Sequence, residues 1–212
     1  MAYSLRLIED RLAANATAPV SRAPRVLYAV EGALLADGAS EPARAVGPGA
    51  GRARAAATPA RVYRVELVRQ PPPPAGGRVL LEHPIDLAGG TGRAGGTGWL
   101  MRCDRVDFDP GAVAPPHRHQ GGGIRCLLQG RLEVTVGAGA PRAVAPGEAW
   151  FESGREPVLA VAARDGETSF IRVSILPAAI RGRSSIVYVD PAAAARGRPR
   201  RYTVYVDEPI AP

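Results

Sequence analysis

The chain has 212 residues and a formal net charge of +7, with 46% hydrophobic and 22% charged residues. This length and composition fit a globular protein with one large β domain or two small ones. Every basic residue is arginine, and the arginines are scattered rather than gathered in one run with aromatic residues, so we do not expect a nucleic-acid-binding protein.

The N-terminal stretch MAYSLRLIEDRLAANA lacks the long apolar run of a signal peptide, and no segment approaches the roughly 18 uncharged apolar residues of a membrane span. We therefore expect a cytoplasmic protein without membrane contact. Cys103 and Cys126 form no CxxC pair and lie in apolar runs, so we expect free core thiols, although one disulfide is compatible with the sequence.

The 25 glycines and 21 prolines predict many turns and short strands. Residues 3–13 fit either a strand or a short helix, and residues 70–77, QPPPPAGG, are expected to be a linker because four successive prolines cannot join a sheet. After a glycine-rich stretch, 88–98, that is expected to form a loop, short strand-like runs follow without a helical pattern, which indicates an antiparallel sandwich or barrel. The predicted strands in chain order are 25–35 (broken by a turn at Glu31-Gly32), 61–69, 78–87, 99–108, 123–129, 131–136, 147–152, 158–163 and 168–176.

The C-terminal tail, residues 178–212, contains two further strand-like runs at 185–189 and 201–206, and between them a segment, 191–196, that fits one helical turn. Its alternating apolar residues predict that the tail docks onto a sheet. Exposed strand edges, together with this tail, make a homodimer the expected assembly.

The sequence also repeats itself. RVLYAVEG at 25–32 aligns with GIRCLLQG at 123–130, and VYRVEL at 62–67 aligns with FIRVSI at 170–175. Two histidines, His117 and His119, fall opposite Pro19 and Ser21 of the first copy. The pattern therefore indicates a two-copy β protein in which one copy carries the site.

His117 and His119 are one residue apart, so on an extended chain their side chains point to the same side and form a ready pair of metal ligands. A third ligand would have to be a carboxylate or His83. Glu152 is the best candidate because it lies on the strand after a Pro-Gly turn, and Glu148 has the same parity and comes next. His83 precedes a proline near the linker, so we expect it at the surface or in packing. The alternative for the histidine pair is substrate binding without a metal.

Two more residues are candidates for ligand binding. If the strand parity carries through the turn at 121–123, Arg125 points inward with the histidines, and a buried arginine needs an anion such as a carboxylate. If the glycines shift the parity, Arg125 faces solvent instead. Trp150 either lines the pocket or simply packs in the core.

The spacing of Gly111, His117-Arg-His119 and Gly130 resembles the first motif of the cupin superfamily: a glycine, five residues, HxH, three or four residues, a glutamate, six residues and a glycine. The second cupin motif is present only as Pro146-Gly147 followed by EAWFE. The resemblance implies an all-β bicupin with two antiparallel jelly-roll β-barrels, the first degraded and the second complete. The implied divisions are 1–70 for the degenerate barrel, 71–97 for the linker and glycine-rich loop, 98–177 for the barrel with HxH, and 178–212 for the docking tail.

The sequence departs from the cupin pattern at two places. The motif glutamate falls on Gly123, and the histidine of the second motif falls on Trp150 or on Pro157-Val158, depending on the alignment. The resemblance still implies a divalent metal (Fe, Mn, Ni or Zn) and a small, anionic organic ligand, in a metal-dependent oxygenase or isomerase. The alternative is a non-catalytic small-molecule binding or sensing cupin with a degenerate metal site.

Overall fold

The structure is a computed structural model that describes residues 2–19, 22–37, 43–48, 51–69, 73–87, 98–195 and 200–212. Its regular elements are antiparallel β-strands and two short 3-10 helices, η1 (Ala178–Ile180) and η2 (Pro191–Ala195). The predicted all-β fold class is confirmed, and residues 3–13, where the sequence left two options, form a strand. None of the described helices has the length and hydropathy needed to span a bilayer.

The first half of the chain forms a five-stranded sheet with the order β4-β2-β6-β1-β7 and a small ribbon of two strands, β3 and β5. The long strand β1 pairs with β6 on one side and with β7 on the other. The strands are β1 (Tyr3–Leu12), β2 (Arg25–Glu31), β3 (Leu34–Ala36), β4 (Ala45–Val46), β5 (Ala53–Ala55), β6 (Ala60–Arg69) and β7 (Arg78–Ile85). The glycine-rich stretch at 88–97 lies outside the described residues.

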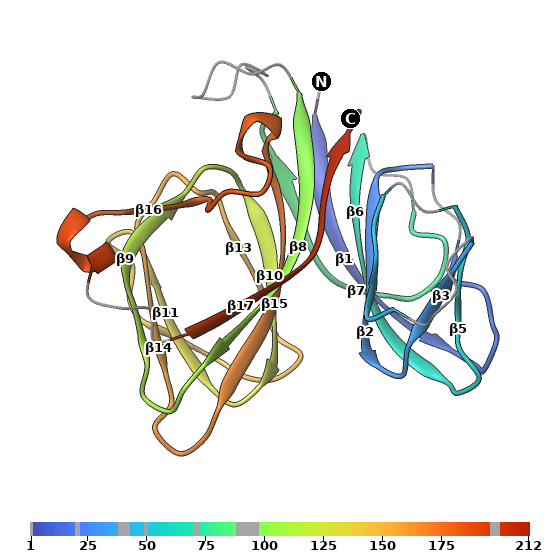
Figure 1. Cartoon of the computed structure of the whole chain (residues 1–212), viewed down its shortest axis with the longest axis horizontal. Coiled ribbons are helices and arrows are strands. Elements are labelled where there is room, and N and C mark those ends of the chain that lie inside the picture. Colours follow the sequence, from blue (N-terminus) through green and yellow to red (C-terminus); the bar gives the residue numbers. More distant parts are fainter. Residues whose placement is uncertain are drawn as a thin grey trace.

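The second half forms two five-stranded sheets, β13-β10-β15-β8-β17 and β12-β11-β14-β9-β16. Figure 1 shows these strands closing around a common interior beside the first half, with the tail strand β17 crossing between the halves. The strands are β8 (Trp99–Phe108), β9 (Val113–His119), β10 (Gly123–Gln129), β11 (Leu132–Val136), β12 (Arg142–Val144), β13 (Ala149–Glu152), β14 (Val158–Ala162), β15 (Thr168–Pro177), β16 (Ile186–Tyr188) and β17 (Arg200–Ile210).

The two halves share a local strand order that follows the sequence repeat. Strands β2, β6 and β1 lie side by side in the first half, as β10, β15 and β8 do in the second. Leu27 pairs with Arg64, and the aligned residues Arg125 and Arg172 also pair. The residue that ends each aligned block, Gly32 or Gly130, has a positive φ of 73° or 77°, which explains why both copies use glycine there.

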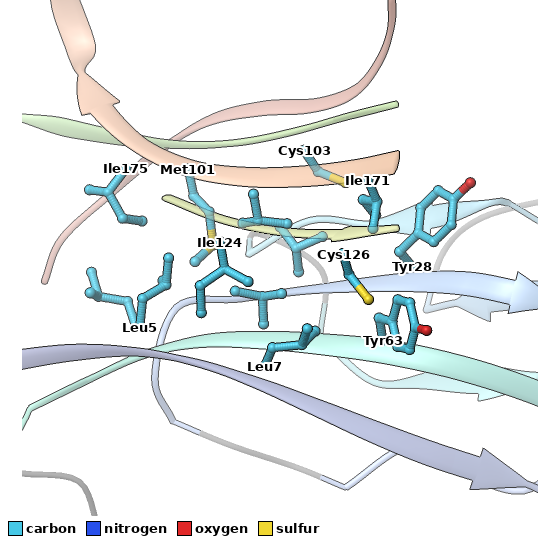
Figure 2. Close-up of a cluster of buried hydrophobic side chains, with 14 of the residues drawn as sticks. Leu5, Leu7, Tyr28, Tyr63, Met101, Cys103, Ile124, Cys126, Ile171 and Ile175 are labelled. Carbon is cyan, nitrogen blue, oxygen red and sulfur yellow. The ribbon is translucent and has the colours of Figure 1, made fainter. Parts of the chain in front are cut away.

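The largest apolar core lies between the two halves, where the outer faces of the two central sheets meet (Figure 2). Strand β15 is buried along its whole length: Ile171, Val173 and Ile175 face this core, whereas Phe170 and Arg172 line the interior of the second half. The buried members of this core are Leu5, Leu7, Val26, Tyr28, Tyr63, Val65, Leu67, Ile85, Met101, Cys103, Ile124, Cys126, Ile171, Val173, Ile175 and Val206.

Cys103 and Cys126 both lie in this core as free thiols, as the sequence predicted. Burial raises the pKa of both thiols, that of Cys126 to about 11. Their position and their raised pKa values describe buried apolar side chains rather than reactive nucleophiles.

The tail adds an edge strand to each sheet of the second half. β17 pairs with β8 from Arg200↔Phe108 to Ile210↔Trp99, and β16 pairs with the histidine-bearing strand β9. These pairings place residues of the tail beside the interior of the second half.

Candidate functional site

A cavity of about 20 Å³ lies inside the second half, between its two sheets. The five residues predicted to form the site all line it. Its polar walls come from both sheets and from the tail: His117, His119, Arg125, Trp150, Glu152, Arg172 and Tyr202. Apolar residues complete the lining: Val106, Phe108, Ala114, Leu132, Val158, Ala160 and Phe170.

The two histidines point inward because of a local irregularity in β9. Pro115 and Pro116 cannot donate hydrogen bonds to a neighbouring strand, and the register between β9 and β14 shifts next to them. Ala114 and His117 are consequently both buried, and the normal alternation then buries His119. His117 and His119 therefore lie on the same side of β9, as their i, i+2 spacing predicted.

Each histidine ring is held through its Nδ1 atom. Nδ1 of His117 lies 2.7 Å from the carbonyl oxygen of Pro115, an obligatory acceptor, so Nδ1 carries the proton and Nε2 the lone pair in the neutral ring. Nδ1 of His119 lies 3.4 Å from Oγ of Ser185, a buried residue just before β16. The rings are perpendicular, with centroids 4.9 Å apart. This anchoring is the arrangement that commonly orients imidazole ligands.

Glu152 reaches the same space from β13. Trp150 and Glu152 are the buried residues of this short strand, and Trp150 Nε1 donates a hydrogen bond of 2.8 Å to Glu152 Oε1. The other carboxylate oxygen, Oε2, lies 3.5 Å from His119 Nε2 and 2.8 Å from Arg125 Nη2. Glu152 thus connects the tryptophan, a histidine and the arginine.

Arg125 faces inward, which settles the choice that the glycine turn left open. Its side chain is 1% exposed, and burial, opposed by the nearby carboxylate of Glu152, lowers its pKa to about 10. Nη1 donates to the carbonyl oxygen of Gly123 at 2.5 Å. The 2.8 Å approach of Nη2 to Glu152 Oε2 lacks the geometry of a hydrogen bond, so within the described residues both atoms are buried without a hydrogen-bond partner.

The two remaining candidate ligands, Glu148 and His83, lie outside the cavity lining. Glu148 is outside the cavity lining, where its Oε2 accepts a hydrogen bond from the backbone N–H of Ala145 and closes the turn. His83 on β7 stacks on Phe151 with ring centroids 3.8 Å apart, on the other face of β13. The expectation that His83 serves in packing agrees with this contact.

The structure leaves no room for a side chain at Gly123, the position of the motif glutamate. A Cβ atom there would lie 2.5 Å from the carbonyl oxygen of Val173 and 2.6 Å from Oγ of Ser174. Strand β15 therefore approaches too closely for any side chain, and the carboxylate in the site comes from Glu152 instead.

Four residues that line or support the cavity were not predicted from the sequence: Arg172, Asp104, Ser185 and Tyr202. Arg172 sits beside Arg125 across the β10–β15 pair and donates two hydrogen bonds, of 3.0 and 2.8 Å, to Asp104. Although burial alone lowers the pKa of Arg172, its pairing with Asp104 raises it. The alternation of β15 could have placed Arg172 inside. Ser185, which contacts His119, and Tyr202, which lines the cavity, carried no signal because only docking of the tail brings them there.

His117, His119 and Glu152 offer two imidazoles and one carboxylate, which are side-chain types that bind divalent metal ions. They do not form a closed cage: across the described parts of the chain, no three His, Cys, Asp or Glu side chains are gathered closely enough to hold a metal ion. The guanidinium of Arg125 takes up one side of the Glu152 carboxylate.

Residues 104–173 match the family model described as a cupin domain. No curated protein matches the sequence. Among solved structures, AerE from Microcystis aeruginosa has 12% identity and a TM-score of 0.56 over 81% of this chain and 88% of its own. Salicylate 1,2-dioxygenase from Pseudaminobacter salicylatoxidans has 13% identity and a TM-score of 0.52 over 95% and 75%. Procruciferin, an 11S globulin from Brassica napus, has 8% identity and a TM-score of 0.52 over 80% and 75%.

These likenesses concern the fold. At identities of 8–13%, the chain resembles proteins as different as a dioxygenase and an 11S globulin. The antiparallel jelly-roll architecture predicted from the sequence is confirmed, and the activity has to be argued from the cavity itself.

Proposed function

We propose that the second half binds a divalent metal ion, Fe, Mn, Ni or Zn, through His117, His119 and Glu152, and a small carboxylate beside Arg125. The three side chains are not gathered closely enough in the structure, so they have to move together when the ion binds. The observation that carries this proposal is the 3.5 Å separation of His119 Nε2 and Glu152 Oε2. Two atoms bound to one ion at about 2.0–2.2 Å lie at most about 4.4 Å apart, so this pair is already within the required span.

The other cavity residues support this assignment. The Nδ1 contacts of His117 and His119 fix both rings, and Trp150 fixes one oxygen of Glu152. The apolar lining limits water, which strengthens every charged interaction in the cavity. A bound metal would supply Lewis acidity or a site for O₂.

The ligand in this proposal is a small acid. Arg125 presents a planar, buried guanidinium, which suits a carboxylate. The cavity has a volume of about 20 Å³, so only the smallest acids fit unless its walls move apart. An oxygenase or isomerase acting on such an acid is the enzymatic form of the proposal, and the name of one fold neighbour, salicylate 1,2-dioxygenase, gives it a precedent with an acidic substrate.

We assign the site to one copy of a bicupin, with residues 1–70 as the degraded barrel and 98–177 as the complete one. The equivalent interior of the first half holds a buried ion-pair cluster, in which Arg64 binds Asp10 at 2.7 Å and Glu66 at 2.6 Å. Leu27 stands where the second half has Arg125. These features support a structural role for the first copy.

The test is metal content. Purified wild-type protein is expected to contain close to one equivalent of Fe, Mn, Ni or Zn by elemental analysis, and His117→Ala and His119→Ala are expected to lose it. His83→Ala is the matched control, because it removes the third histidine of the chain outside the cavity. A wild-type preparation that contains no metal and takes up none of the four added ions would refute the proposal.

The second candidate is a binding or sensing protein without a metal. The ion pair between Arg125 and Glu152 favours it, because this pair neutralises the carboxylate with a residue of the chain itself. This alternative predicts metal-free protein whose melting temperature rises with a small carboxylate in wild type and not in Arg125→Met.

A further inference from the structure

The charges in the cavity wall balance without any added ion. Two arginines and two carboxylates are each almost fully buried, with exposures of 1% for Arg125, 6% for Arg172, 2% for Asp104 and 5% for Glu152. Arg172 is committed to Asp104 by two hydrogen bonds, and Arg125 pairs with Glu152. A ligand with a net charge would add an uncompensated charge to this buried wall, which is costly. The wall therefore favours a ligand whose own charges sum to zero.

Two atoms of this wall lack a hydrogen-bond partner within the described residues. Nη2 of Arg125 is a buried donor and Oε2 of Glu152 is a buried acceptor, and they lie 2.8 Å apart. The other ends of both side chains are committed, because Arg125 Nη1 donates to the carbonyl oxygen of Gly123 and Glu152 Oε1 accepts from Trp150. Leaving buried polar atoms unsatisfied is costly, so a ligand gains by offering an acceptor to Nη2 and a donor to Oε2.

Simple ions satisfy only one of these two atoms. A carboxylate such as acetate accepts from Arg125 Nη2, but it brings only acceptors to the neighbouring Glu152 Oε2 and adds a negative charge. An ammonium such as methylammonium donates to Oε2, but it repels Arg125 and adds a positive charge. A ligand that meets both requirements carries a carboxylate and an ammonium together.

An α-amino acid has these two groups at a matching distance. Its bond lengths place the nitrogen and the nearer carboxylate oxygen about 2.7 Å apart. Arg125 Nη2 and Glu152 Oε2 are 2.8 Å apart. The four atoms can therefore form a ring in which each cation faces an anion, and hydrogen bonds between charged groups are the stronger kind. Because a zwitterion has no net charge, the wall stays neutral when it binds.

We propose that the cavity binds the smallest α-amino acids as zwitterions. The carboxylate of the ligand accepts from Arg125 Nη2, and its ammonium donates to Glu152 Oε2. This inference rests on the part of the proposed function that places a carboxylate beside Arg125, and it requires no metal ion. The volume of about 20 Å³ restricts the class to ligands without a large side chain, so glycine is the probe.

The experiment measures the affinities of the chelator-treated full chain for glycine, acetate, glycolate and methylammonium by calorimetry at equal ionic strength. We expect glycine to bind about tenfold or more tighter than acetate, because its ammonium adds a hydrogen bond between charged groups. Glycolate, which offers Oε2 a neutral hydroxyl donor, is expected between the two. Methylammonium is expected to show no binding.

Two variants separate the roles of the two side chains. In Glu152→Gln the preference for glycine is expected to disappear, and acetate is expected to bind more tightly than in wild type, because it then neutralises the unpaired Arg125. This gain cannot come from a misfolded variant. Arg125→Met is expected to bind neither ligand. Arg131→Met is the matched control, since Arg131 is an exposed arginine paired with Asp165, and it keeps the wild-type preference.

Each outcome separates this inference from the proposed function. Equal affinity for glycine and acetate in wild type overturns the inference and leaves a carboxylate site beside Arg125 standing; this comparison does not depend on any variant folding. An unchanged glycine preference in a folded Glu152→Gln also overturns it, because the ammonium would then have another partner. If neither ligand binds to wild type, the inference fails together with the carboxylate part of the proposed function, whereas the metal part is decided by the metal content.

Discussion

The ion pair between Arg125 and Glu152 makes a quantitative prediction for the metal-free protein. Glu152→Gln keeps the shape of the side chain and an oxygen for Trp150 but removes the charge that lies 2.8 Å from Arg125. Arg125 is 1% exposed, and a guanidinium keeps its proton at pH 7 in proteins, so its charge stays buried in the variant. Removing one partner of a buried pair costs about 3–5 kcal/mol, so we expect the free energy of unfolding to fall by about 3 kcal/mol.

The assay is urea denaturation of chelator-treated wild type, Glu152→Gln, Arg125→Met and the double variant. The double variant is expected to recover most of the stability, because replacing a buried ion pair with neutral side chains is often neutral or stabilising by about 1–4 kcal/mol. Glu148→Gln is the control: this carboxylate closes a surface turn, and its change is expected to stay within about 0.5 kcal/mol. If Glu152→Gln behaves like Glu148→Gln, then Arg125 does not depend on Glu152, and the reasoning about a dry, charge-balanced wall is wrong.

Two further predictions concern stability. In Gly123→Ala the new Cβ would lie 2.5 Å from a carbonyl oxygen of β15, so we expect urea denaturation to show a free energy of unfolding lower by about 1–3 kcal/mol. Gly166→Ala is the control, because no atom lies within 4 Å of its new Cβ, and its free energy of unfolding is expected to stay unchanged. Equal effects of the two substitutions would contradict the steric argument. For Cys126, the unfolded thiol ionises above about pH 9 and the folded thiol only above about pH 11, so the unfolded state loses its proton first and stability falls as pH rises through this window. Cys126→Ala should therefore lose less stability than wild type between pH 8.5 and about pH 10.5 in parallel urea titrations; an identical loss would argue against a buried thiol.

The local sequence pattern was enough to predict the fold class and to place both histidines on the same, inward-facing side of their strand. Alternation and turn residues predicted the short strands, and the i, i+2 spacing of His117 and His119 placed both rings on one side. The direction of Arg125 could not be predicted, because it depends on how β10 pairs with β13 and β15 after a run of three glycines. Gly123 looked like a lost ligand, but the close approach of β15 requires glycine there.

The contributions of the tail could not be read from local sequence. Ser185 holds His119, and Tyr202 lines the cavity, through strand pairings between segments far apart in the chain. Alternating apolar residues in the tail predicted docking onto a sheet but not which sheet edge. The homodimer, the cytoplasmic location, the divalent metal and the small carboxylate ligand remain predictions.

The apolar core between the halves constrains only one side of the strands in the first half. Residues of β1, β2 and β6 that face this core, such as Leu7 and Val65, cover one face of the second half. Residues on the opposite side of the same strands, such as Arg64, face away from that contact and close their own interior with ion pairs. On the proposed bicupin assignment, the first half can therefore lack every ligand on one side of its strands while the other side stays indispensable, so that absence of chemistry and retention of fold are expected together.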